Sequence, residues 1–232
     1  MALLDTEQYI KNYNEILGSI TESKQDEVKI ISVSKSHPKE AMKRAYDSGL
    51  RVFGENYVQE MVEKYEWLEE GIKSEIDWHF IGHLQTNKVK YIAPFVDCVH
   101  SVYKLKLAKE ISKRAKQNER TIDILLQVNT SGEDSKSGCD PSDAVDIAKG
   151  IIELDNVNLK GLMTISGLDS TDDERKEEFA LLADLKNKIN NQLNIHLQEL
   201  SMGMTADYQL AIEQGSTMIR VGTAIFGERV YS

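Results

Sequence analysis

Cysteine is rare in this sequence, and a long hydrophobic run is absent. The two cysteines, Cys98 and Cys139, form no Cys-x-x-Cys pair, which excludes a disulfide framework and favours a reducing cytoplasm. No apolar run approaches the ~20 residues that are needed to cross a bilayer. Residues 1–20 carry acids and tyrosines where a signal peptide has an apolar segment. We therefore expect a cytoplasmic protein with no membrane partner.

Basic residues are also in the minority. The chain has 28 Lys and Arg against 38 Asp and Glu, a formal net charge of -10. Such a surface repels phosphate backbones, so nucleic acid is not an expected partner. The densest basic run, residues 104–120, has the pattern of a solvated helix above a buried stripe of Leu105, Ala108, Ile111 and Ala115.

Proline is scarce as well, with three residues, and no Pro/Gly/Ser-rich segment divides the chain. A length of 232 residues suits an α/β barrel that forms one domain. We therefore expect residues 1–232 to form a single domain. Residues 1–25 should supply an extra N-terminal helix that packs on the barrel through Tyr9, Tyr13, Ile16, Leu17 and Ile20.

Short runs rich in β-branched residues alternate with amphipathic stretches along the rest of the chain. Strands are predicted at 28–35, 51–55, 77–82, 96–102, 121–129, 158–165, 196–202 and 217–223. Helices are predicted at 38–48, 56–70, 86–92, 103–117, 141–153, 173–192 and 205–214. This alternation indicates parallel βαβ units and a fold of the α/β class, a single (β/α)8 TIM-like barrel. A doubly wound sheet is the alternative.

The stretch ISVSKSHPKE, residues 31–40, ends an apolar strand with Lys35. In a parallel barrel the carboxyl ends of the strands carry the chemistry. A lysine that is partly shielded from water there has a lowered pKa, and its neutral amine forms Schiff bases with carbonyl compounds. The alternative is a lysine whose ammonium simply extends to solvent.

Two further segments lie at the ends of the seventh and eighth predicted strands. In LSMGMTADY, residues 200–208, Ser201 is followed by a turn and by Thr205, which we expect to cap the next helix. In IRVGTAIFG, residues 219–227, Gly222 and Thr223 allow a backbone to approach a ligand closely. Barrels often bind phosphate on these two loops, and closure brings the eighth strand beside the first.

Arg220 precedes the second of these loops. As a residue within a strand it must point into the barrel or onto a helix, and its guanidinium stays protonated. The alternative to a ligand contact is a structural ion pair with a glutamate.

These segments together resemble one known family. In this order, VSKSHP, FGENYVQE, WHFIGHLQTNK, HSV, QVN, KSG, GLMTI, LSMGMTADY and IRVGTAIFG closely resemble the motifs of the pyridoxal phosphate homeostasis proteins. That family is related to the N-terminal barrel of alanine racemase, the fold-type III pyridoxal phosphate (PLP) group. The resemblance runs from about Val28 to the C-terminus. Thr205 stands where the family usually has serine.

The resemblance implies a cofactor site. Lys35 would hold pyridoxal 5'-phosphate as a Schiff base, and Arg220 would face the pyridine nitrogen. The resemblance further implies phosphate contacts from Ser201, Gly222, Thr223 and the backbone around Met202, a ring contact from Asn56, and a cofactor floor made by His79 and Met163. For the last two, ordinary packing in the barrel interior is the alternative.

The resemblance also implies a function. The protein would hold PLP and deliver it to PLP-dependent apo-enzymes, without robust catalysis, and we expect a monomer. Racemases of this fold add a β domain and a catalytic tyrosine from a partner subunit, whereas this chain ends at Ser232. One alternative is a PLP-dependent amino-acid racemase or decarboxylase. Another is an aldolase whose Lys35 acts directly on a sugar phosphate.

Overall fold

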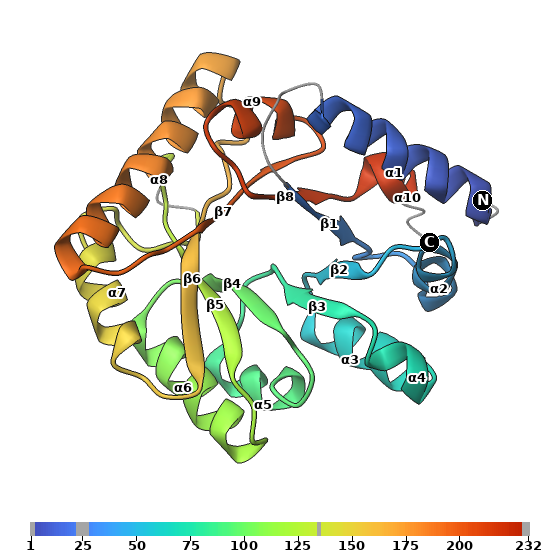
Figure 1. The fold of residues 1–232 in the computed structure, drawn as a ribbon, viewed down its shortest axis with the longest axis horizontal. Coiled ribbons are helices and arrows are strands. Elements are labelled where there is room, and N and C mark those ends of the chain that lie inside the picture. The colour runs from blue at the N-terminus through green and yellow to red at the C-terminus, as the bar shows by residue number, and fades with distance from the viewer. Residues whose placement is uncertain (1–2, 22–27, 134–135, 229–232) are drawn as a thin grey trace.

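A computed structural model describes residues 3–21, 28–133 and 136–228. Eight parallel strands close into a barrel in sequence order (Figure 1). They are β1 (Lys29–Val33), β2 (Val52–Glu55), β3 (Asp77–Phe80), β4 (Cys98–Val102), β5 (Ile122–Gln127), β6 (Val157–Met163), β7 (Glu199–Met204) and β8 (Met218–Val221). The predicted (β/α)8 barrel is confirmed, and the closed sheet rules out the doubly wound alternative.

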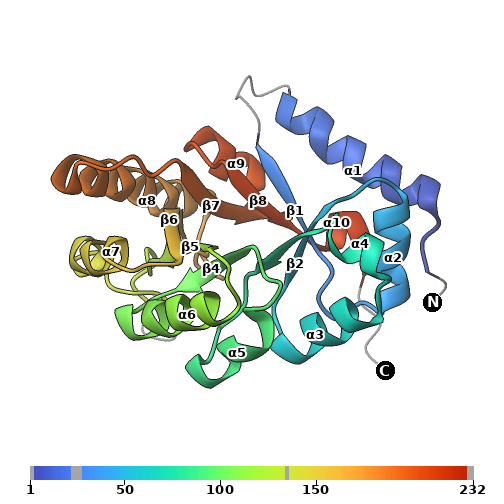
Figure 2. The ribbon, with the colours of Figure 1, turned by 60° about the horizontal axis from the view of Figure 1, so that its bottom comes forward.

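Helices surround the barrel, as Figures 1 and 2 show. They are α1 (Thr6–Thr21), α2 (Lys39–Asp47), α3 (Val58–Trp67), α4 (Glu70–Lys73), the 3-10 turn η1 (Thr86–Lys88), α5 (Val89–Ile92), α6 (Leu105–Gln117), α7 (Ala144–Ile152), α8 (Asp172–Leu193), α9 (Tyr208–Glu213) and α10 (Thr223–Phe226). The helix predicted at 56–70 is two helices, because Leu68 and Glu69 adopt extended backbone angles between α3 and α4.

The N-terminal helix α1 lies beside α2 and α10 (Figure 2). Tyr9 and Ile16 are buried there, as predicted, but Leu17 is 43% exposed. The reason is geometric, since Leu17 is rotated by about 100° from Ile16 on the helix and leaves the narrow contact face. The side-chain amide of Asn12 donates to the carbonyl oxygen of Ile225 at 2.9 Å, which ties α1 to α10.

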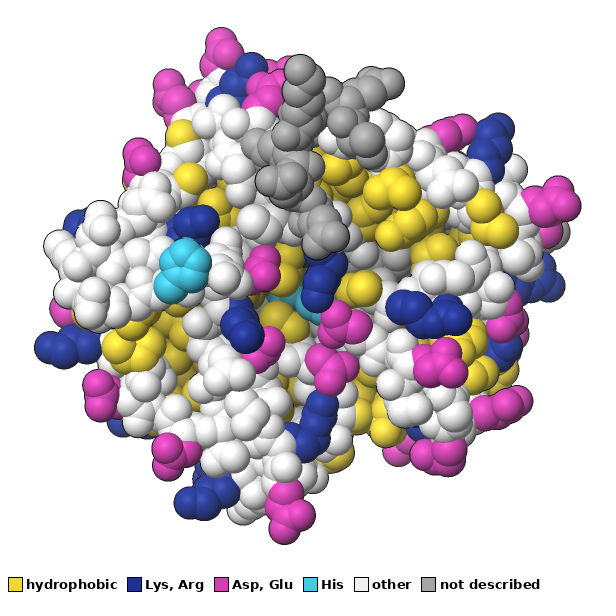
Figure 3. Space-filling view, viewed as in Figure 1, with side chains coloured by type: hydrophobic (Ala, Val, Ile, Leu, Met, Phe, Trp, Pro, Cys, Tyr) yellow, Lys and Arg dark blue, Asp and Glu magenta, His cyan; other side chains and the backbone are white. Residues whose placement is uncertain are grey.

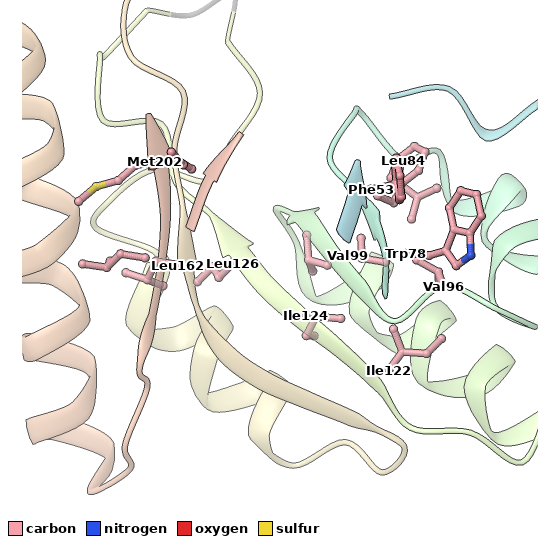
Figure 4. Close-up of a cluster of buried hydrophobic side chains, with 14 of the residues drawn as sticks. Phe53, Trp78, Leu84, Val96, Val99, Ile122, Ile124, Leu126, Leu162 and Met202 are labelled. Carbon is pink, nitrogen blue, oxygen red and sulfur yellow. The ribbon is translucent and has the colours of Figure 1, made fainter. Parts of the chain in front are cut away.

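Side chains alternate along each strand between an apolar outer layer and the barrel interior, which holds both apolar and polar groups. The outward set packs under the helices, and Figure 4 shows part of it, including Trp78, Leu126 and Met202. Inside the barrel, Cys98, Leu125, Met163 and Met218 form a smaller cluster. No helix in the described part of the chain is both long and apolar enough to span a membrane.

The pairing of β1 with β8 closes the barrel. Ile31 is the neighbour of Arg220, and Ser32 is the neighbour of Val221. Because side chains alternate with a period of two residues, Lys35 follows Val33 on the inner side of the barrel. Closure therefore brings the end of β1 next to the loop that follows β8, as the sequence predicted.

Candidate functional site

A cavity of about 250 Å3 opens at the carboxyl ends of the strands. It is lined by segments that follow or end β1, β2, β3, β6, β7 and β8. The lining residues are Val33, Lys35, Asn56, Ile81, Ile165, Met204, Thr205, Ala206, Arg220, Gly222 and Thr223. Five of the nine residues predicted from the sequence are among them: Lys35, Asn56, Arg220, Gly222 and Thr223.

The loop that carries Lys35 is held from behind by a buried charged network. Ser36, with a left-handed φ of 61°, donates its backbone N–H to Oε1 of Glu60 at 2.7 Å. Ser34 donates its hydroxyl to Oε1 of Glu55 at 2.5 Å. The residues on both sides of Lys35 are thus fixed, which limits where its half-buried side chain can reach.

Lys64, on α3, joins these contacts. Its ammonium is 2.7 Å from Oε1 of Glu55, 2.8 Å from Oε1 of Glu60 and 2.7 Å from the carbonyl oxygen of Ser34. Lys64 and Glu55 are both buried. Burial raises the pKa of Glu55, while the positive charge of Lys64 opposes that shift. The network therefore depends on keeping both partners together.

Arg220 is buried in the inner wall of the barrel. One N–H group donates to Oγ of Ser201 at 2.8 Å, and another donates to the carbonyl oxygen of Thr164 at 2.9 Å. Burial lowers the pKa of Arg220 to about 10, so the guanidinium stays charged near neutral pH. Among the described residues it forms no ion pair with a glutamate, so the alternative of a structural pair is wrong.

The loops after β7 and β8 face each other across the cavity. Gly222 and Thr223 begin α10, and Thr205 and Ala206 contribute from the β7 side. Thr205 is not the predicted helix cap, because α9 begins later, with Asp207 in the cap position.

The carboxylate of Asp207 holds the loop after β7 through two hydrogen bonds. It accepts hydrogen bonds from the backbone N–H of Met204 and from the hydroxyl of Ser166, both at 2.6 Å. Asp207 is only 4% exposed, so these bonds have no competition from bulk water. They fix the chain immediately before and after Thr205 and Ala206.

Four predicted residues lie elsewhere. Ser201 is fully buried inside the barrel, and Met202 points outward into the apolar layer beside α8 (Figure 4). His79 and Met163 are buried in the barrel interior and do not line the cavity. Their position therefore agrees with the alternative, which is ordinary packing in the barrel interior. β7 continues to Met204, two residues beyond the predicted end at 202, which leaves Ser201 in mid-strand.

Asn56 offers a direct test of whether a polar ligand fits. Its Oδ1 atom is buried and has no hydrogen-bond partner in the described structure, although the residue lines the cavity. A buried polar atom without a partner is costly, and a ligand that supplies a complementary group removes that cost. Lys35, the Arg220 cation and the small residues of the β8 loop complete a set that suits an aldehyde with a ring and an anionic group.

The fold and this cavity define a class of protein, namely a (β/α)8 barrel in which a lysine at the end of β1 shares a cavity with the glycine-containing loop after β8. The chain belongs to the alanine racemase N-terminal domain family, whose model matches residues 4–230, and within it to the pyridoxal phosphate homeostasis proteins. The resemblance noted in the sequence is therefore confirmed.

Individual relatives match over almost the whole chain. The pyridoxal phosphate homeostasis protein of Aquifex aeolicus is 42% identical over 203 residues, covering 88% of each chain. That of Vibrio cholerae is 43% identical over 206 residues, covering 88% of this chain and 87% of the relative. PipY of Synechococcus elongatus, solved with PLP bound, has a TM-score of 0.83 and 34% identity, covering 94% of this chain and 100% of PipY.

Proposed function

We propose that this protein binds PLP, holds it as a Schiff base on Lys35 and serves PLP homeostasis and delivery without robust catalysis of its own. One observation carries the proposal. Lys35, the Arg220 cation and the Gly222–Thr223 loop line one cavity, in a chain whose relatives are named for PLP homeostasis. The PLP-bound relative of the same fold supports it.

Each lining residue has a role in this proposal. The Lys35 amine would hold the aldehyde, and Gly222, Thr223 and Thr205 would hold the phosphate group. Asn56 donates to or accepts from a polar group on the ring, since its amide can do either. Ser201, which lies behind the cavity wall, acts through its hydrogen bond to Arg220. His79, Met163 and Met202 support the barrel around the site.

Arg220 favours a carrier over a catalyst. Bound PLP supplies an electron sink, and that sink is strongest when its pyridine nitrogen is protonated. A fixed cation beside that nitrogen opposes its protonation, because like charges repel. With a pKa of about 10, Arg220 keeps its charge at neutral pH. With Arg220 at that nitrogen, the site would stabilise carbanions only weakly.

The absorbance spectrum of the purified protein tests the proposal. We expect a visible Schiff-base band after loading with PLP, its loss on adding hydroxylamine, and no band in Lys35→Ala. Arg220→Ala and Ser201→Ala should release PLP more readily on gel filtration without losing the band. Lys11→Ala, at an exposed position on α1, is the matched control. A colourless protein that borohydride traps only with a sugar phosphate would support the aldolase alternative.

Turnover distinguishes the carrier from the enzyme. The PLP-loaded protein is incubated with single enantiomers of amino acids, and racemisation and CO2 release are followed. We expect rates far below those of ordinary enzymes. Turnover of about 1 per second or more would favour the racemase or decarboxylase alternative.

We further propose that the protein is a cytoplasmic monomer that passes PLP to transient apo-enzyme partners. Light scattering should give the mass of one chain. A PLP-dependent apo-enzyme is mixed with the loaded protein or with an equal amount of free PLP, and a phosphatase in both mixtures removes PLP from solution. The loaded protein should activate the apo-enzyme faster. Equal rates would contradict direct delivery.

A further inference from the structure

A line of polar side chains crosses the barrel interior from the cavity wall to the opposite end. Arg220 donates to Oγ of Ser201 at 2.8 Å. Oγ of Ser201 lies 2.8 Å from Nδ1 of His100. Nε2 of His100 lies 2.6 Å from Nδ1 of His79. The line ends where Nε2 of His79 lies 3.0 Å from Oδ1 of Asp77.

The arginine determines the direction of every hydrogen bond in this line. A guanidinium only donates, so Oγ of Ser201 accepts from Arg220. Among the described residues the Ser201 hydroxyl has no other acceptor than Nδ1 of His100, so its hydrogen goes to that nitrogen, which is then unprotonated. His100 therefore carries its proton on Nε2 and donates it to Nδ1 of His79. That leaves the proton of His79 on Nε2, facing Asp77.

The charges at both ends agree with this direction. Burial acts to raise the pKa of Asp77, but contacts with His79 and Lys29 outweigh it and lower that pKa to about 2. The line thus runs from a cation at the cavity to an anion at the end where β1 and β3 begin. Figure 3 shows that charged side chains of both signs gather around the centre of one end of the barrel.

The hydrogen-bond directions leave each histidine with a single proton, on Nε2, so neither adds a charge in this arrangement. Burial lowers the pKa of His100 well below its ordinary value, and the positive charges of Arg220 and Lys29 act in the same direction. Burial also raises the pKa of the neighbouring Cys98 thiol well above its ordinary value, so that group is neutral. Nε2 of His79 lies 3.0 Å from Oδ1 of Asp77, but the two atoms are not aligned for a full hydrogen bond.

We propose that His100 and His79 are positioning residues for the cofactor site, both neutral and both protonated on Nε2. They supply the acceptor for the Ser201 hydroxyl hydrogen, which turns the oxygen lone pairs toward Arg220 and keeps the guanidinium in the cavity wall. This inference rests on the proposed PLP function. An extra proton on the pair would reverse the line, and the buried Ser201 hydroxyl hydrogen would then have no acceptor.

Nitrogen NMR on protein labelled at the histidines tests the tautomers without any cofactor. Near neutral pH, we expect His79 and His100 to show a proton on Nε2 and an unprotonated Nδ1. In Ser201→Ala the Nδ1 signal of His100 should shift, because its hydrogen bond is lost. A proton on Nδ1 of His100 in the wild type would overturn the assignment.

Two substitutions at His100 separate positioning from packing. In His100→Asn the amide reaches the place of Nδ1 and can still accept from Ser201. In His100→Gln it reaches the place of Nε2 and cannot. We expect PLP affinity within about threefold of wild type for asparagine and a loss of about tenfold for glutamine, the cost of one charge-linked hydrogen bond.

Equal losses in the two variants would mean that His100 only fills space, which would overturn the positioning role. If wild-type protein binds no PLP, the proposed function fails and the role toward the cofactor fails with it, while the NMR result still decides the direction of the hydrogen bonds.

Discussion

The ammonium of Lys64 lies 2.7 Å from Oε1 of Glu55 inside the wall of the barrel. Water cannot replace either partner of this contact, because Lys64 is 3% exposed and Glu55 is fully buried. It also binds the carbonyl oxygen of Ser34, the residue before Lys35. The pair therefore links the stability of the fold to the position of Lys35.

Replacing Lys64 by methionine should be strongly destabilising. The substitution leaves the Glu55 carboxyl buried without its partner, which typically costs about 3–5 kcal/mol of unfolding free energy. The double variant Lys64→Met, Glu55→Gln should recover most of that loss, because no charge remains buried. Urea denaturation measures both values.

Lys11→Met supplies the control for this experiment. Lys11 pairs with Glu15 at 3.9 Å on an exposed face of α1, so its loss should cost less than about 0.5 kcal/mol. Equal costs for Lys11→Met and Lys64→Met would contradict a structural role for the buried pair.

The buried His100 predicts a stability that depends on pH. Its pKa in the folded protein lies well below the ordinary value, so below about pH 6.5 the unfolded chain binds a proton that the folded one rejects. The contribution is present above that pH and is lost as the pH falls. In His100→Asn the slope should be smaller, by at most about 1.4 kcal/mol per pH unit.

Urea midpoints of wild type and His100→Asn at several pH values between about 5 and 8 measure this difference. The surrounding charges, Arg220, Lys29 and Asp77, are the same in both proteins, so subtracting the curves isolates His100. Parallel curves would show that His100 has the same pKa folded and unfolded.

Asp207 should control the loop that follows β7 at the cavity. Asp207→Ala leaves the buried N–H of Met204 without an acceptor, which costs about 1–3 kcal/mol of stability. PLP should also bind more weakly, because Thr205 and Ala206 lose their support. Asp207→Asn keeps an acceptor and should lose less of both.

Urea denaturation and PLP titration follow the two variants, with exposed Asp169→Ala as the control. An Asp207→Ala variant with wild-type stability and wild-type PLP affinity would show that the carboxylate does not hold this loop.

Much of the fold follows from local patterns in the sequence. The alternation of strands and helices predicted the barrel, and barrel closure predicted that Lys35 would share a cavity with Gly222 and Thr223. Both predictions use rules that act within one βαβ unit or between neighbouring strands.

Strand ends and distant contacts are harder to predict from the sequence. The resemblance implies phosphate contacts from Ser201 and Met202, and these contacts stay a prediction; β7 was predicted to end at 202 but runs to Met204, so both residues lie within the strand and outside the cavity lining. The contact between Lys64 and Glu55 joins a helix to a strand, and no local pattern in the sequence fixes how those two elements pack. Asp207 had a visible signal, an acid at the start of a helix, but its partner Ser166 lies on another loop.

Gly82 supports Asn56 through close backbone contact. A Cβ atom at position 82 would lie 2.1 Å from the carbonyl oxygen of Asn56, so the backbone must move in Gly82→Ala. We expect a loss of about 1–3 kcal/mol in stability, typical of overpacking, and weaker PLP binding because Asn56 leaves its place at the cavity. Gly18→Ala, on an exposed turn of α1 with no atom near the new methyl group, should instead gain about 0.5–1 kcal/mol. Urea denaturation and PLP titration of both variants make the comparison, and unchanged PLP affinity in Gly82→Ala would show that Asn56 does not contact the cofactor.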